Sequence, residues 1–252
     1  MPFFRILVGL FALLINFPLL VSMPHAQSFQ AEPESYSFKN VLIDEKLHDI
    51  FRHIPRNSNV KLSSPGGWPI GMNIGSIIDH NNIIIEISDF CISGCAEYLL
   101  PAGKQIRFTG NPIIAVHGNP KIWREVALIH KPEVNDLCPN TVFEAYEKFA
   151  DEFNINNNFW TDQIDTLGIE KVSFSILPSG CPKISIKYTN EYWLLSSNQI
   201  KYYFDVETTG KVCADDLKYC SKVVSQRWKA GTAVIIGDTK FISVGWLKSW
   251  FL

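Results

Sequence analysis

Apolar runs in the first half of the chain alternate with turn residues, and they predict strands and helices in turn. Ile43 to Ile54 repeats apolar residues at helical spacing, and Val60 to Leu62 is a short apolar strand. The strand ends in the turn Ser63-Ser64-Pro65-Gly66-Gly67, and helical spacing resumes from Ile70 to Ile78. Ile83 to Ile87 is largely β-branched, which favours a strand buried on both faces.

The same order of elements then repeats. A strand ends near Phe90, residues 91–95 form a turn, and Ala96 to Ala102 continues as a helix closed by Gly103. Ile113 to Val116 is the next apolar strand. Strands that alternate with helices predict an α/β fold with right-handed connections. In such a fold the ligand lies outside the carboxyl ends of the strands.

The second half of the chain is more helical. Its hydrophobic spacing predicts helices at 141–153, 159–167 and 196–203, strands at 172–177 and 183–188, and a hairpin of 233–236 with 241–244.

The N-terminus has the pattern of a secretory signal. Arg5 is followed by an apolar run from Ile6 to Val21 and then by small and polar residues up to Ala26. We therefore expect cleavage after Ala26, with an uncleaved membrane anchor over Phe3 to Met23 as the alternative. The predicted organisation is a signal peptide at 1–26, a linker at 27–40, one domain at 41–210 and a C-terminal extension at 211–252.

Composition narrows the class of protein. The chain has 252 residues, of which 46% are hydrophobic and 19% are charged, so a sizeable core can form. The net charge is -2, and like charges do not occur in blocks, which argues against a nucleic-acid partner. No later apolar run is long enough to span a bilayer, so the mature part is expected to be soluble.

The chain contains six cysteines, an even number that suggests disulfides in an exported protein. We expect Cys213 to pair with Cys220 and Cys138 to pair with Cys181. Cys91 and Cys95 are either bonded to each other or packed as free thiols. The histidines are not clustered with the cysteines, so we expect no metal, and no cofactor is indicated.

Ser93, His117 and the Gly66-Gly67 turn all fall at the predicted carboxyl ends of strands, where chemistry is expected. A serine is a nucleophile only beside a base and beside donors aimed at the developing oxyanion. The N–H of Gly94, at the first turn of a helix, is a candidate donor, and that of Gly67 is a second. Taken singly, Ser93 could equally be a helix cap and His117 a structural residue.

Together, these motifs resemble the Clp protease proteolytic subunit and its relatives in the Clp-protease/crotonase superfamily. The resemblance lies in Ser64-Pro65-Gly66-Gly67, in Ser93 opening a helix that runs to Ala102-Gly103, and in His117 after an apolar strand. Trp193 to Tyr203 is similar to a further segment of that family. The turn from Cys91 to Cys95 resembles that of an exported bacterial branch. The resemblance covers about residues 60 to 205, as judged from the extent of the motifs.

The resemblance implies a fold and a site. The fold would be a spiral of βα units with a small C-terminal extension. The implied site has the nucleophile Ser93, the base His117, the orienting acid Glu191 (with Asp165 and Asp162 as substitutes), and the oxyanion donors Gly67 and Gly94. If bonded, Cys91 and Cys95 would stiffen the turn that carries Ser93.

The chain also departs from the family. Pro101 should kink or shorten the helix after Ser93, and Tyr203-Phe204 replaces the usual Tyr-Gly. Segments that would dock an unfoldase chaperone are not evident, so small or unfolded peptides are the expected substrates.

Three functional classes follow. The first is a periplasmic serine peptidase or related acyl hydrolase acting on a peptide or protein. The second is an inactive relative that binds a peptide or partner protein in the same cleft. The third is an acyl-thioester enzyme or a Ser-Lys peptidase, for which Lys104 and Lys187 are available. A homo-oligomer and a membrane tether through the N-terminus are further expectations.

Overall fold

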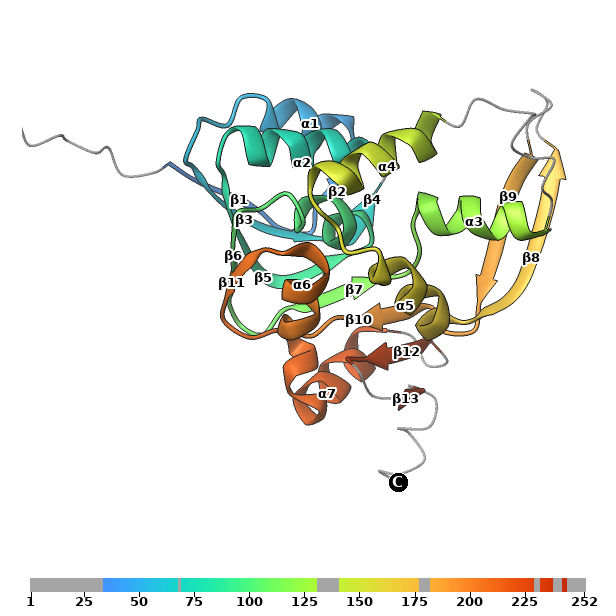
Figure 1. Ribbon diagram of the computed structural model, residues 1–252. Coiled ribbons are helices and arrows are strands. Elements are labelled where there is room, and N and C mark those ends of the chain that lie inside the picture. Colours follow the sequence, from blue (N-terminus) through green and yellow to red (C-terminus); the bar gives the residue numbers. More distant parts are fainter. Residues whose placement is uncertain are drawn as a thin grey trace, which may run out of the picture. The chain divides into compact units, whose positions relative to one another are not determined.

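A nine-stranded sheet runs through the residues that this computed structural model describes, which are 34–67, 69–130, 141–176, 182–228, 232–237 and 242–243 (Figure 1). Its strands follow the order β1 (Ser35–Phe38), β3 (Asn59–Ser64), β5 (Ile84–Ile92), β7 (Ile113–Val116), β10 (Tyr192–Leu194), β12 (Ala233–Ile236) and β13 (Ile242–Ser243). β6 (Gln105–Phe108) pairs with β5 and with β11 (Glu207–Thr209). The sheet is mainly parallel and the fold is α/β, as predicted.

The long strand β5 organises the sheet because it pairs with two different strands. Its first half, Ile85 to Ile87, pairs with β6, and its second half, Phe90 to Ile92, pairs with β7. The sequence predicted two separate strands here. One continuous strand forms instead. Ile85 and Ile87 are buried while Asp89 is exposed, and the backbone stays extended from the first half of the strand to the second.

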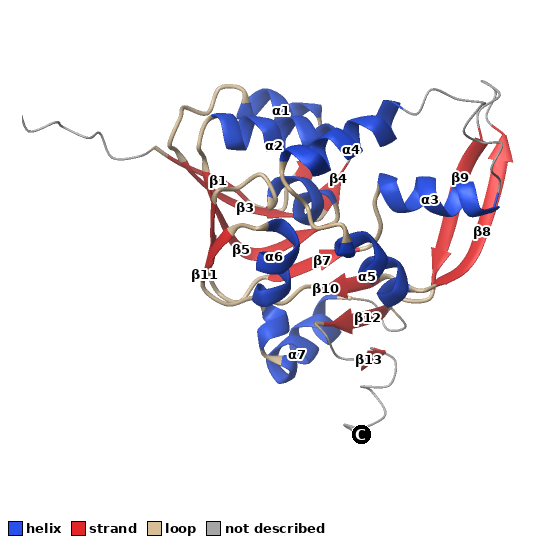
Figure 2. Ribbon diagram, in the orientation of Figure 1, coloured by secondary structure: helices blue, strands red, loops and turns tan. Residues whose placement is uncertain are grey.

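Helices α1 (Glu45–Phe51) and α2 (Ile70–His80) contact each other beside the sheet (Figure 2). α1 begins later than predicted. The carboxylate of Asp44 accepts a hydrogen bond from the N–H of Leu47 at 2.9 Å and so caps the helix. The residues before Asp44 form β2 (Leu42–Ile43), which pairs in parallel with β4 (Gly66–Gly67).

The helix after Ser93 is a short π-helix, η1 (Cys95–Leu99), rather than the helix predicted for 96–102. The N–H of Leu100 donates to the carbonyl of Cys95, which is the i+5 spacing of a π-helix. Pro101 cannot donate a backbone hydrogen bond, so the helix stops before it, as its position in the sequence predicted.

Later in the chain, α4 (Thr141–Glu152), α5 (Asn158–Leu167) and α6 (Ser197–Phe204) occupy the predicted helical segments. β8 (Ile169–Ile176) and β9 (Pro182–Tyr188) form a separate antiparallel pair. Three elements were not predicted: α3 (Pro120–His130), α7 (Leu217–Arg227) and the 3-10 turn η3 (Cys213–Asp215). In α3 the buried residues Ile122, Val126 and Ala127 recur at helical spacing, so the signal was present.

The main sheet includes strands from outside the predicted domain 41–210. The described residues all belong to one compact unit, Pro33–Leu252. β1 lies inside the segment predicted as the linker 27–40, and it pairs with β3. β12 lies inside the predicted extension 211–252, and it pairs with β10 of the main sheet. The predicted signal peptide lies outside the described residues.

Disulfides join Cys91 to Cys95 and Cys213 to Cys220, and the second of these pairs was predicted. The predicted partners Cys138 and Cys181 lie outside the described residues. Disulfides are typical of a non-reducing, exported environment. Within the described ranges, no helix has the length and apolar character needed to cross a membrane. The same ranges hold no cluster of three or more potential metal ligands.

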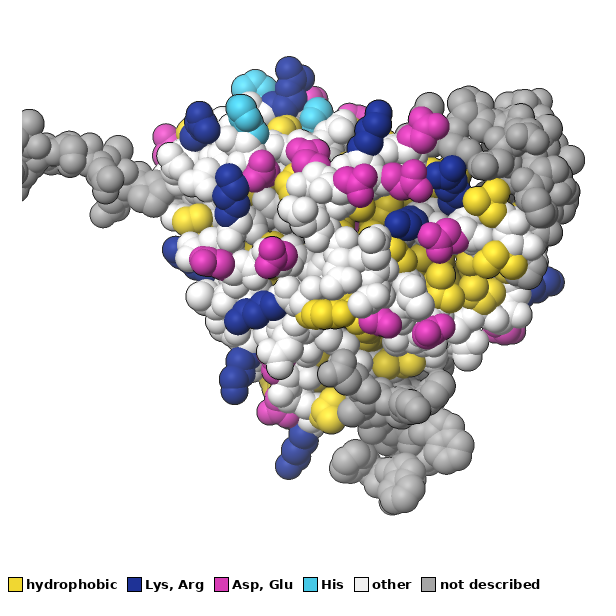
Figure 3. All heavy atoms as spheres, viewed as in Figure 1, with side chains coloured by type: hydrophobic (Ala, Val, Ile, Leu, Met, Phe, Trp, Pro, Cys, Tyr) yellow, Lys and Arg dark blue, Asp and Glu magenta, His cyan; other side chains and the backbone are white. Residues whose placement is uncertain are grey.

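Charges of both signs are intermixed on the molecular face in Figure 3, and hydrophobic side chains gather there near α3 and the β8–β9 hairpin. Trp123 and Ile129 of α3 are among the exposed apolar residues.

Candidate active site

Ser93 lies in a tight turn between β5 and η1, and its backbone has an unusual conformation. Its φ angle is 55°, in the left-handed region that residues other than glycine seldom adopt. Two hydrogen bonds hold it there. Its N–H donates to the carbonyl of Ala115 at 2.8 Å, and its carbonyl accepts from the N–H of Glu97 at 2.9 Å. Strained conformations of this kind occur often at functional sites, and each costs about 1–3 kcal/mol.

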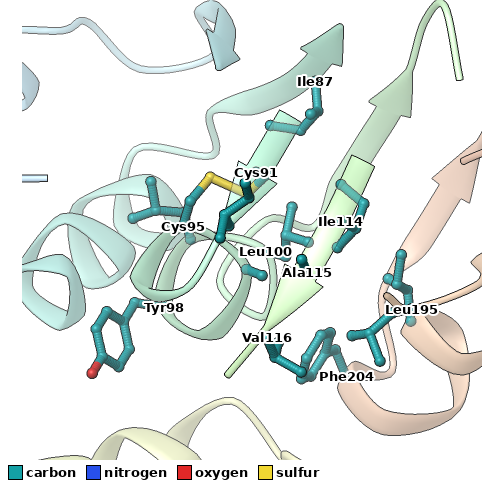
Figure 4. Close-up of a cluster of buried hydrophobic side chains, with 14 of the residues drawn as sticks. Ile87, Cys91, Cys95, Tyr98, Leu100, Ile114, Ala115, Val116, Leu195 and Phe204 are labelled. Carbon is teal, nitrogen blue, oxygen red and sulfur yellow. A yellow bond between two sulfur atoms is a disulfide. The ribbon is translucent and has the colours of Figure 1, made fainter. Parts of the chain in front are cut away.

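The Cys91–Cys95 disulfide bridges the two sides of this turn. Figure 4 shows it joining Cys91 on β5 to Cys95 on η1, with Leu100 and Ala115 nearby. Both sulfur-bearing residues are fully buried. The bond restrains the ends of a turn whose middle residue, Ser93, is only half-buried.

His117 reaches Ser93 because of the register between parallel strands. Ile92 at the end of β5 lies beside Ala115 of β7, so the residues that follow the two parallel strands lie at the same edge of the sheet. The imidazole Nε2 of His117 lies 2.7 Å from the Oγ of Ser93, as the sequence analysis predicted. If the hydroxyl donates this bond, Nε2 is the unprotonated nitrogen and Nδ1 carries the ring proton.

Burial lowers the pKa of His117 below its ordinary value of 6.5, and a hydrogen bond with its own backbone opposes this shift in part. The ring is therefore neutral at pH 7. A neutral imidazole can accept a proton from a serine hydroxyl, whereas an imidazolium cannot.

Tyr192, rather than Glu191, lies against the imidazole. β10 pairs antiparallel with β7, with Trp193 opposite Val116, so the next pair brings Tyr192 to His117. The two rings meet edge to face with their centroids 5.6 Å apart. Glu191 is exposed, and within the described residues no hydrogen bond or ion pair links it to His117. The predicted acid is therefore not at the histidine, because its neighbour in the sequence takes the position opposite His117.

The substitute acids are also placed elsewhere. The Oδ2 of Asp162 accepts a hydrogen bond from the hydroxyl of Tyr203 at 2.7 Å, and Asp165 is exposed. Neither lysine considered for a Ser-Lys dyad contacts Ser93. Lys104 pairs with Asp79 at 3.3 Å and Lys187 with Glu170 at 2.6 Å, both at the surface.

The Gly66-Gly67 turn packs directly against the serine turn, as predicted. β3 lies beside β5 with Ser64 opposite Cys91, so the following residues arrive next to Ser93. A Cβ on Gly66 would lie 2.5 Å from the carbonyl oxygen of Ile92, and one on Gly94 would lie 2.9 Å from that of Gly67. The two backbone segments that carry the candidate donors are thus in contact beside the hydroxyl.

Four polar or aromatic residues near this site were not predicted from the sequence. Tyr192 could have been found from the pairing of β10 with β7, had β10 been predicted. Glu97, Gln163 and Asn119 are buried polar residues joined by hydrogen bonds. In the sequence, only Glu97 could have drawn attention, because it is a charged residue inside an otherwise apolar segment.

Comparison with known proteins gives distant similarity. No family model matches the chain, and no curated protein sequence matches it. Among solved structures, it is similar to the ClpP protease catalytic domain from Plasmodium falciparum, with 14% identity and a TM-score of 0.37 over 70% of this chain and 85% of that chain. It is also similar to a ClpP1 mutant from Listeria monocytogenes, with 11% identity and a TM-score of 0.37 over 70% of this chain and 91% of that chain.

Similarity at this level does not decide an activity. The chemistry of the site therefore rests on its own geometry.

Proposed function

We propose that this protein is an exported serine hydrolase of the Clp-protease-like type, in which Ser93 is the nucleophile and His117 is the general base. The observation that carries the proposal is the 2.7 Å contact between the Ser93 hydroxyl and Nε2 of His117. A neutral imidazole at this distance is the arrangement that activates a serine. The proposal includes the spiral of βα units that the motifs of the sequence imply.

The reaction would follow the acyl-transfer scheme. His117 Nε2 takes the proton of Ser93 as Oγ bonds to the substrate carbonyl carbon, whose oxygen becomes an oxyanion. The N–H groups of Gly94 and Gly67 are the proposed donors to that oxygen, and one such donor is worth about 3–4 kcal/mol of barrier. The C–N or C–O bond then breaks as His117 returns the proton to the leaving group. Water hydrolyses the acyl-serine by the same steps, with His117 again as base.

The proposed catalytic group is a Ser-His pair without a carboxylate on the histidine. Orientation of the ring, which an acid supplies in a triad, would come from the Tyr192 contact and from the partial burial of the imidazole. The substrates we propose are small or unfolded peptides in the periplasm, since the two disulfides agree with an oxidising compartment.

A non-catalytic role is the second candidate, and the placement of Glu191 favours it. A site without its acid can still bind a peptide beside a polar Ser-His pair.

The test is a fluorophosphonate probe, which phosphonylates activated serines with loss of fluoride. The full chain, produced in a host that exports it, should form one covalent adduct, and mass spectrometry of the digested protein should place it on Ser93. An adduct on another serine would overturn the role of Ser93. No adduct near neutral pH would overturn the hydrolase and support the binding role.

Glu191→Gln tests whether the carboxylate of Glu191 takes part in the activation of Ser93. Because Glu191 is exposed and does not contact His117, the variant should react with the probe at the rate of the unmodified protein. A large fall in the rate constant for reaction with the probe, measured at pH 7 on folded protein, would show that Glu191 contributes to catalysis.

A further inference from the structure

A buried carboxyl group lies one helical turn beyond the serine. Glu97 of η1 is only 2% exposed, and its backbone N–H donates to the carbonyl of Ser93. An ionised carboxylate in such a place requires a cationic partner. Among the described residues, no lysine, arginine or histidine pairs with Glu97. Its side-chain Oε1 instead accepts a hydrogen bond from the amide Nε2 of Gln163 at 3.3 Å.

Gln163 extends this contact to the other half of the site. It is fully buried on α5, and its Oε1 accepts from the amide of Asn119 at 2.7 Å. Asn119 follows His117 by two residues and caps α3, because its Oδ1 accepts from the N–H of Ile122 at 3.1 Å. The three side chains therefore connect the element after the nucleophile to the element after the base.

The other titratable groups around Glu97 are tyrosines. They are Tyr98 on η1 itself, Tyr146 on α4 and Tyr188 on β9. Burial raises the pKa of each, and the negative charge of an ionised Glu97 raises it further, while a hydrogen bond with Trp123 opposes the shift of Tyr188. All three are therefore neutral at physiological pH. Among the described residues, the buried hydroxyl of Tyr146 has no hydrogen-bond partner. Within the described ranges, these surroundings offer no positive charge that would stabilise a carboxylate.

We propose that Glu97, in its protonated form, is a positioning residue that joins the serine turn to the histidine loop through Gln163 and Asn119. The inference rests on the proposed function, since it assigns how the Ser93–His117 contact is held. When Glu97 loses its proton, a buried charge without a partner appears one turn from Ser93. Relief of that charge requires η1 to move, and the serine turn moves with it.

The titration of Glu97 agrees with this role. Burial raises its pKa to about 8, and the hydrogen bond from Gln163 opposes the shift. Glu97 therefore keeps its proton at neutral pH and loses it under mildly alkaline conditions, where His117 is neutral throughout. An alkaline loss of reactivity then comes from Glu97 rather than from the base.

The test compares probe reaction rates from pH 5 to pH 10. The unmodified protein should lose reactivity above about pH 8. Glu97→Gln retains an oxygen that accepts from Gln163 and cannot ionise, so it should match the unmodified protein at pH 7 and keep its rate at alkaline pH. Gln163→Met should be slower at pH 7 by about tenfold or more, since a 1 Å misplacement of reacting groups can cost about 10²-fold. Gln199→Met, a matched loss of a buried amide that caps α6, should not slow the reaction.

Urea unfolding supplies a readout that does not depend on activity. The folded chain holds the Glu97 proton up to about pH 8, whereas the unfolded chain releases it near 4.5, so the folded state binds more protons between these values. Stability therefore falls as pH rises through this window. The difference in stability between Glu97→Gln and the unmodified protein should grow across the same interval and level off above it.

The outcomes separate the two ideas. An unmodified protein that never reacts with the probe overturns the proposed function and the positioning role with it. If the protein reacts and Glu97→Gln shows the same alkaline decline, the positioning role alone is overturned. It is also overturned if folded Gln163→Met reacts as fast as Gln199→Met.

Discussion

His117→Ala should react with a fluorophosphonate about 10²–10⁴ times more slowly than the unmodified protein, because it removes the general base. Ser93→Ala should not react at all. The 2.7 Å contact between the two side chains explains why both changes act on one step. The measurement is the second-order rate constant of adduct formation at pH 7, with circular dichroism to show that each variant is folded.

His80→Ala is the matched control, since this exposed histidine lies at the end of α2, away from the site. It should react normally. Because burial lowers the pKa of His117, the reaction of the unmodified protein should also persist below pH 6.5 and decline only at more acidic pH. A His117→Ala protein that keeps its rate would show that the serine is activated by something else.

Gly66→Ala should lower both stability and reactivity. The φ angle of Gly66 is 99°, and a non-glycine residue in such a conformation costs about 1–3 kcal/mol. The added Cβ would also lie 2.5 Å from the carbonyl oxygen of Ile92 and 2.6 Å from the Cβ of Ser93. Relief of that overlap must displace the serine turn. Urea unfolding and the probe rate constant report the two effects.

Gly103→Ala is the control for this substitution. Gly103 is also buried, but a Cβ there would lie 3.1 Å from the side chain of Ile106 and 3.6 Å from the carbonyl oxygen of Leu100, so it would meet no backbone atom closer than ordinary contact. It should therefore change stability much less than Gly66→Ala and leave the probe reaction intact. Equal effects of the two alanines would mean that the contact between the glycine turn and the serine turn does not matter.

The sequence was informative wherever local pattern and strand order agree. The β-branched runs at Ile83 to Ile87 and Ile113 to Val116 predicted buried neighbouring strands, and parallel strands end on one side of a sheet. That was enough to bring Ser93, His117 and the Gly66-Gly67 turn together.

Features that depend on tertiary pairing could not be predicted. β10 has three residues, too few to show a periodic pattern, and the register that sets Tyr192 rather than Glu191 opposite His117 exists only once β7 and β10 pair. The π-helical turn and the left-handed Ser93 likewise follow from contacts with Ala115 and Gly66. The side-chain partner of Glu97, Gln163, lies 66 residues away from it in the sequence, so no local pattern could show the contact.

β10 has one further consequence for how the protein reaches its native state. It is bordered on one side by β7, which delivers the histidine, and on the other by β12, near the end of the chain. Pairings between such distant segments form slowly, since a long loop must close first. The aromatic ring that packs on the imidazole is therefore in place only after synthesis has passed Tyr192, so a nascent chain that ends between His117 and Tyr192 carries its nucleophile and its base without this support.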